Sequence, residues 1–140
     1  MKDASQTNIA GYGGYQPIID AVESLLGVSV DLLSTGGGCV ALGAELEGGA
    51  QIMITDAQDT LSTWAQRAAA KEDGICYGYL VGVYADVPTG YEPVSYVAGR
   101  VTETPAGVVA LVQRALHEAA AVVGFTPQGE CIEPTVVDVI

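Results

Sequence analysis

The chain has 140 residues and a mass of 14.3 kDa, the size of one domain that can bury its own core. Hydrophobic residues make up 49% and charged residues 16%, which excludes a disordered chain, and the apolar runs are too short to cross a bilayer. Seventeen acidic against five basic residues give a formal charge of −12, which argues against direct nucleic-acid binding and favours a basic protein partner.

Residues 1–8 lack the apolar segment of a secretory signal, so we expect a cytoplasmic protein that does not bind membranes. Cys39, Cys76 and Cys131 are an odd number without C-x-x-C spacing, which favours reduced thiols over disulfides. A zinc site would require all three cysteines to converge with His117, the one histidine. We therefore expect neither a metal nor another cofactor.

Residues 1–16 are polar or rich in glycine and tyrosine and follow no helical or strand period, which predicts a loose arm. A single α+β domain is expected over residues 17–140. Its first helix is predicted over residues 17–27, since Pro17 suits the first turn of a helix and Gly27 its end.

Three strands are predicted next, over residues 28–33, 39–46 and 51–55, because polar and apolar side chains alternate there. A three-residue loop between the second and third strands keeps their apolar side chains on one face, whereas a two-residue turn shifts the register by one. The longer loop predicts three cross-strand pairs: Leu46 with Ala50, Ala44 with Ile52, and Leu42 with Ile54.

Three consecutive glycines, Gly36, Gly37 and Gly38, lie between the first two strands. They suit a turn or bulge, because glycine adopts backbone conformations that other residues avoid. The alternative is a ligand cradle in which Thr35 and the glycines offer backbone N–H groups and a nearby Trp64 offers a stacking surface. The turn is favoured, since no lysine follows as in a P-loop and no G-x-G-x-x-G is present.

In a catalytic version of that site, Cys39 acts as the nucleophile and Asp56, across the hairpin, assists it. A reactive cysteine needs a lowered pKa, and the neighbours in sequence are carboxylates rather than basic side chains. This argues against an enzyme. Asp56 has a second interpretation as the N-cap of a following helix.

That second helix is predicted over residues 56–72, followed by a long strand over residues 75–84, a loop over residues 86–93 and a short edge strand over residues 94–101. The buried stripe expected on the helix comprises Leu61, Trp64, Ala65 and Ala68.

The strongest helix is predicted over residues 105–123, with Thr104 as its N-cap and Gly124 as its stop. Residues 136–140 are expected either to add an edge strand or to bind a second subunit. The predicted fold is α+β: a mainly antiparallel sheet of four to five strands with two or three helices on one face, the last helix covering the glycine-bearing face of strand 75–84. Five residues of the last helix form its expected buried stripe: Val108, Val112, Ala115, Ala119 and Val123.

The run Ser-Thr-Gly-Gly-Gly-Cys, followed by a hairpin that ends in Thr-Asp, resembles small uncharacterised proteins of actinobacteria and their phages. The resemblance covers residues 31–56. It implies a phage or mobile-element origin, hence a host cytoplasm, and supplies no activity.

Two hypotheses follow. The first is a small non-enzymatic interaction protein whose acidic surface binds a basic host or phage protein, in one version by occupying a nucleic-acid-binding surface. The alternative is a small-molecule or nucleotide-binding domain, catalytic in one version, that uses the glycine loop at residues 35–39.

Overall fold

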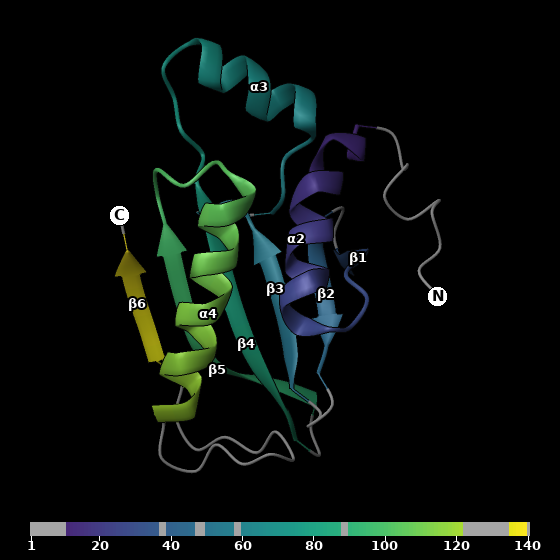
Figure 1. Ribbon diagram of the computed structural model, residues 1–140, viewed down its shortest axis with the longest axis vertical. Coiled ribbons are helices and arrows are strands. Elements are labelled where there is room, and N and C mark those ends of the chain that lie inside the picture. Colours follow the sequence, from purple (N-terminus) through teal and green to yellow (C-terminus); the bar gives the residue numbers. More distant parts are fainter. Residues whose placement is uncertain are drawn as a thin grey trace.

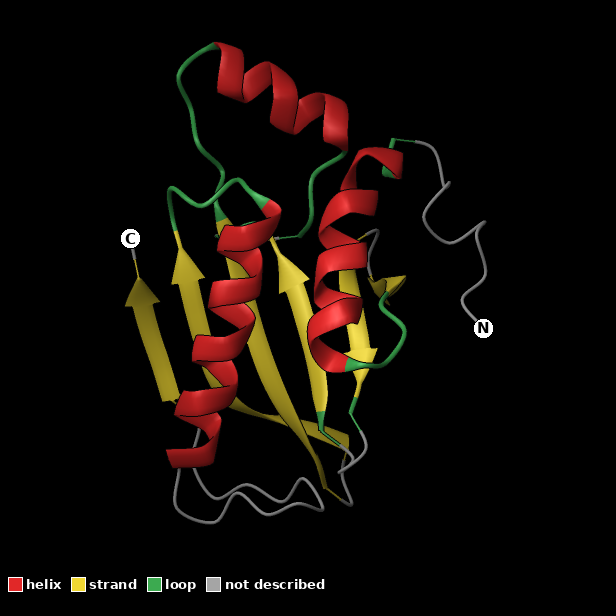
Figure 2. Ribbon diagram, in the orientation of Figure 1, coloured by secondary structure: helices red, strands yellow, loops and turns green. Residues whose placement is uncertain are grey.

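A computed structural model of the protein describes residues 11–36, 39–46, 50–57, 60–87, 90–121 and 135–139. It confirms the α+β class: a mainly antiparallel sheet with helices α2 and α4 on one face and α3 beyond the ends of the strands (Figures 1 and 2). The strands are β1 (Asp31–Gly36), β2 (Cys39–Glu45), β3 (Gln51–Thr55), β4 (Tyr79–Val87), β5 (Gly90–Gly99) and β6 (Thr135–Val139). The helices are the 3-10 turn η1 (Gly13–Tyr15), α2 (Gln16–Leu26), α3 (Trp64–Glu72) and α4 (Pro105–Ala121).

The strands lie in the sheet in chain order, β1 to β6. Strands β1 to β5 pair antiparallel, and β6 joins β5 in parallel. The five antiparallel strands agree with the predicted four to five, and the C-terminal segment adds a parallel edge strand, one of the two roles expected for it.

The β2–β3 hairpin has the predicted register. Leu42 pairs with Ile54 and Ala44 with Ile52, while the Leu46 N–H donates to the Ala50 carbonyl at 2.8 Å. The three loop residues, 47–49, lie outside the described residues. This register buries the apolar side chains of both strands on one face of the sheet, as the alternating sequence pattern predicted.

The first and last helices lie close to their predicted bounds. Gly27 ends α2 with a left-handed φ of 73°. The Thr104 hydroxyl accepts the Gly107 N–H at 3.1 Å at the start of α4, as an N-cap does. Four residues of the expected stripe, Val108, Val112, Ala115 and Ala119, are buried in one core with the inner face of the sheet. Val123 and Gly124 lie outside the described residues.

The second helix is much shorter than predicted. It begins at Trp64 rather than Asp56, and Thr63 caps it in a capping box with Gln66. The predicted stripe is also wrong for Trp64, Ala65 and Ala68, which are exposed, while Arg67 and Ala70 are buried. Alanine does not distinguish one side of a helix from another, so the sequence pattern does not indicate which side of α3 is buried. The contacts of Arg67 determine that side.

Within the region predicted as a loop, residues 86–93, the described residues 86–87 and 90–93 belong instead to strands β4 and β5, which pair with each other. Proline does not donate to a sheet ladder, and here Pro93 pairs with Tyr84 at a register shift that follows Val83. A bulge thus accommodates the proline within a strand. Strand β5 is not an edge strand, because β6 lies beyond it.

Helix α4 packs on β4 and β5, but on the face opposite the one predicted. Its buried valines share a core with Val81 and Val83, whereas Gly82 lies on the other face under the rings of Tyr84 and Tyr96. Those two rings fill the space that the prediction assigned to a helix. Helix α2 covers the β1–β3 side of the same face of the sheet (Figure 1).

The described part of the expected N-terminal arm packs against the domain. Residues 13–15 form a 3-10 turn, and Tyr15 is completely buried. Residues 1–10 lie outside the described residues. The folded unit therefore includes residues before the predicted boundary at Pro17.

Candidate functional site

The most unusual side chain in the core is Arg67, which is 3% exposed. It comes from the inner side of α3, whose register is set by the capping box at Thr63. A buried arginine carries a large desolvation cost unless its donors are paired. The residues around it supply that pairing from four separate parts of the chain.

Two carboxylates bind the guanidinium. Asp56, at the end of β3, accepts a hydrogen bond from Nη2, and both oxygens of Glu103 lie 3.0 Å from Nη1. The remaining donors bind the Tyr15 hydroxyl at 3.1 Å and the Gly78 carbonyl at 3.1 Å. Arg67 thus connects α3 to the end of β3, the start of β4, the loop before α4 and the N-terminal turn.

Three aromatic rings surround the same cation. The guanidinium carbon lies 4.0 Å from the ring centroid of Tyr79, 5.7 Å from that of Tyr77 and 5.8 Å from that of Tyr15. Arginine over an aromatic face is favourable, particularly where water is excluded. The Tyr79 hydroxyl is buried and has no hydrogen-bond partner among the described residues.

These contacts hold the groups in defined protonation states. Burial raises the pKa of Tyr15 to about 12, against the lowering effect of the Arg67 hydrogen bond, and burial also raises the pKa of Tyr79. Burial alone would lower the pKa of Arg67, but the Tyr15 hydrogen bond and the electrostatic interactions with Tyr79, Tyr15 and Asp56 raise it overall. At neutral pH Arg67 is therefore charged, and Tyr15 and Tyr79 are neutral.

We call Arg67, Asp56, Glu103, Tyr15 and Tyr79 the arginine cluster. Each named charge has a partner and little contact with solvent, so the cluster is built to hold segments together rather than to bind a ligand. No sequence pattern used above singles out Arg67. The feature that could have indicated it is an arginine within an alanine-rich helix of an acidic chain, close in sequence to a strand with alternating tyrosines.

One of the two catalytic candidates, Asp56, belongs to the arginine cluster. Both Asp56 oxygens are engaged, one by Arg67 and the other by the N–H and hydroxyl of Ser62 at 3.2 and 2.5 Å. Asp56 caps no helix, since α3 begins eight residues later. Cys39 is a half-buried free thiol at the start of β2.

The glycine run lies between β1 and β2, which pair antiparallel. Gly36 pairs with Cys39, with a register shift after Ser34. Gly37 and Gly38 lie outside the described residues, as does the side chain of Thr35. The hairpin register supports the turn interpretation.

Trp64 is 37% exposed and packs against the N-terminal turn. Its ring lies edge-on to Tyr15 with centroids 4.9 Å apart, and a Cβ atom on Gly14 would overlap it. The indole therefore has a packing role at this end of the molecule.

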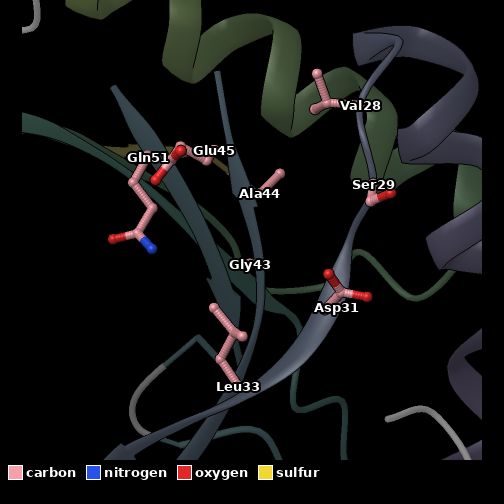
Figure 3. A pocket seen from close by; sticks show the side chains of 8 residues that line it. All are labelled: Val28, Ser29, Asp31, Leu33, Gly43, Ala44, Glu45 and Gln51. Atoms are coloured by element: carbon pink, nitrogen blue, oxygen red, sulfur yellow. The ribbon is translucent and has the colours of Figure 1, made fainter. Parts of the chain in front are cut away.

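A second candidate site is an open notch of about 350 Å³ at the edge of the sheet, which we call the β1 notch. It forms where the chain reaches β1: Asp31 pairs with Gly43 of β2, whereas Val28 and Ser29 precede that pairing. Figure 3 shows Asp31 on one side, Glu45 and Gln51 on the other, and Gly43 between them without a side chain. The notch lining comprises Val28, Ser29, Asp31, Leu33, Gly43, Ala44, Glu45 and Gln51.

Both ionisable side chains that line the β1 notch, Asp31 and Glu45, are carboxylates. Oδ1 of Asp31 is buried and accepts no hydrogen bond from any described residue. A buried carboxylate oxygen without a donor is costly, so a rotation of the Asp31 side chain that brings this oxygen to a donor in the notch gains a charge-assisted bond. A volume of this size lies at the low end for ligand pockets and suits one side chain better than a large cofactor.

The fold and these sites define an acidic α+β domain with a buried ionic cluster and an acidic surface notch. Comparison with known proteins finds no matching family model, no matching curated protein and no matching solved structure. Within the described ranges, no three histidine, cysteine or acidic side chains are grouped to hold a metal ion. No helix in the described part of the chain is long and apolar enough to span a membrane.

Proposed function

We propose that the protein is a non-enzymatic interaction protein that binds a basic protein partner, and that the β1 notch receives a lysine or arginine side chain of that partner. The observation that carries this proposal is Asp31 Oδ1, a buried acceptor without a donor among the described residues, in a notch with a second carboxylate. The net charge of −12 attracts a basic partner over longer distances.

The lining of the notch supports a basic side chain rather than a free ion. Apolar surface from Val28, Leu33 and Ala44 accompanies the carboxylates, and the long stems of lysine and arginine pack on such surface while their charged ends seek acceptors. An inorganic cation needs several ligands close together, and the described residues hold no group of three histidine, cysteine or acidic side chains that could bind one.

The first test uses a small probe. N-acetyl-lysine methylamide is titrated into the 15N-labelled protein, with N-acetyl-norleucine methylamide as the uncharged probe of similar shape. We expect the amide signals of Asp31 and Gly43 to shift with the lysine probe only, with a dissociation constant in the millimolar range typical of a single side chain. The shifts should decrease as sodium chloride rises from about 0.05 to about 0.5 M.

Two variants make the titration specific. Asp31→Asn should weaken lysine binding severalfold, whereas Glu72→Gln, which removes the same charge from an exposed position on α3, should leave it unchanged. Equal behaviour of the two probes, or of the two variants, would show that the notch does not recognise a basic side chain.

The second test uses the partner itself. Proteins captured at low salt by the immobilised protein are identified and purified, and their binding is measured directly against the wild type and Asp31→Asn. We expect binding that weakens with salt and with the variant. Competition by double-stranded DNA would support the version in which the protein occupies a nucleic-acid-binding surface. Failure to recover any salt-sensitive partner would contradict the proposal.

A further inference from the structure

The centre of the sheet face opposite α2 and α4 is apolar. Strand alternation places five half-buried apolar or aromatic side chains on it: Leu33, Met53, Leu80, Tyr84 and Tyr96. Leu33 covers Gly43, the sulfur of Met53 lies 3.5 Å from the Cβ position of Gly43, and the two tyrosine rings cover Gly82, which pairs with Met53. We call this surface the open face.

Among the described residues no helix covers the open face, because α2 and α4 both lie on the other side of the sheet (Figure 2). Antiparallel sheets commonly leave one face to solvent, but that face then carries polar side chains. Here the centre of the face is apolar, which is the character of a sheet covered on both sides.

The open face is continuous with the β1 notch. Leu33 and Gly43 belong to both, and Gln51 and Glu45 continue the same face beyond Met53. The combined surface therefore has an apolar centre and acidic side chains at one edge. A complementary surface has an apolar stripe with a basic side chain at one end.

We propose that the open face docks an amphipathic helix of the partner, whose apolar stripe lies on Met53, Leu80 and Tyr96 and whose lysine or arginine enters the β1 notch. The inference rests on the proposed function and specifies the partner's shape. An amphipathic helix presents such a stripe, and α2 and α4 cover the other face of the same sheet in this way. A second copy of the chain is disfavoured because it brings together two net charges of −12.

The sequence offers a specific reporter for the test. Met53 is one of only two methionines, the other being Met1, so 13C-methyl labelling of methionine gives one signal from the open face. Trp64, the only tryptophan, lies on α3 and reports on a different part of the molecule. The probe is an amphipathic peptide of leucine, alanine and lysine, about eighteen residues long, which forms five turns of helix.

We expect this peptide to shift the Met53 methyl signal while Trp64 fluorescence stays unchanged. A peptide of the same composition, reordered so that its leucines no longer form one stripe, should bind at least tenfold more weakly. Replacing its lysines by glutamine should weaken binding to a similar extent, because the notch then receives no cation.

Variants of the protein locate the binding surface. Leu80→Arg places a charge at the centre of the open face and should weaken peptide binding at least tenfold. Ile75→Arg makes the same kind of change at a side chain that is 54% exposed outside the sheet, and should have no effect. If Leu80→Arg does not fold, Met53→Gln serves instead, with the amide spectrum as the check of folding.

The outcomes separate the two proposals. If basic probes bind and Asp31→Asn weakens them, but Met53 does not shift and Leu80→Arg has no effect, the docking surface is refuted and the proposed function stands. If the lysine probe of the notch also fails, the proposed function falls with it. A Met53 signal that changes with protein concentration, together with a dimer in sedimentation, would show that a second copy covers the face and would overturn the inference.

Discussion

We expect Arg67 to have a large effect on stability, because it pairs with two largely buried carboxylates. Replacing only the cation leaves Asp56 and Glu103 without their partner. Arg114 provides a matched control: it also pairs with a glutamate, but its side chain is 48% exposed, and its partner is Glu118, one turn along the same helix.

We expect Arg67→Met to lower the free energy of unfolding by about 3–5 kcal/mol, the usual result of breaking a buried ion pair. Arg114→Met should cost no more than about 0.5 kcal/mol. Urea unfolding followed by Trp64 fluorescence measures both. Adding Asp56→Asn and Glu103→Gln to Arg67→Met should recover part of the loss, and equal effects of the two methionine variants would mean that the cluster is not a stabilising feature.

The buried tyrosines give a pH dependence of known sign. Burial raises the pKa of Tyr15 to about 12 and also raises the pKa values of Tyr79 and Tyr84. The unfolded chain loses these protons first, near pH 10, while the folded chain keeps them. Their contribution to stability is therefore complete below about pH 10 and decreases above it, by at most about 1.4 kcal/mol per pH unit for each tyrosine.

Two measurements check this pH dependence. Urea unfolding between pH 8 and pH 11 should show a flat region followed by a decline in the free energy of unfolding. Tyrosinate absorbance should show a late-ionising group among the seven tyrosines of the chain. If every tyrosine ionises near pH 10 while the protein remains folded, the hydroxyls are not buried as described.

At the scale of the elements, the start of β4 is held by a close backbone approach. Gly78 has a left-handed φ of 66°, and a Cβ atom there would overlap the carbonyl oxygens of Gly99 and Arg100. Its N–H donates to Glu103 at 2.9 Å and its carbonyl accepts from Arg67. Gly74 has a similar φ of 79°, but nothing lies within 4 Å of its Cβ position.

Gly74→Ala should therefore cost about 1–2 kcal/mol, the strain of a left-handed alanine alone. Gly78→Ala should cost about 1–3 kcal/mol more, because the added methyl group must displace the strand beside it. Thermal unfolding of both variants measures the difference. Equal costs would show that the backbones are not in contact at this point.

The β2–β3 hairpin and the ends of the helices could be predicted from the sequence. Alternation fixed the β2–β3 hairpin because a shift by one residue would expose Leu42, Ile52 and Ile54. Pro17, Gly27 and Thr104 marked the helix ends because each acts through its own backbone or hydroxyl group. These signals are local, so a single sequence suffices to read them.

The remaining features depend on contacts between distant residues. Arg67 meets Glu103 across 36 residues and Tyr15 across 52, and no local pattern encodes that meeting. The long β4–β5 hairpin was missed because Pro93 indicates a loop unless a bulge accommodates it. The β1 notch depends on where β1 and β2 stop pairing, which is likewise a tertiary property.

At the scale of the whole molecule, the net charge of −12 opposes folding, since the native state brings the carboxylates closer together. We expect added sodium chloride to raise the thermal midpoint by several degrees between about 0.02 and about 0.5 M, where the Debye length becomes short. Glu72→Lys, at an exposed position, should raise the midpoint at low salt and reduce the response to salt. A midpoint that falls with salt would show that surface attraction, rather than repulsion, dominates.

The sheet keeps the order of the chain from β1 to β5, and this has a consequence for how the protein acquires its structure. Each of these strands pairs with its neighbour along the chain, so the mean sequence separation of contacts is low for a protein rich in β-structure, which favours rapid folding. The parallel β5–β6 pair has the largest sequence separation of the strand pairs, because it spans the whole of α4. We therefore expect strands β1 to β5 to pair with one another before β6 joins the sheet.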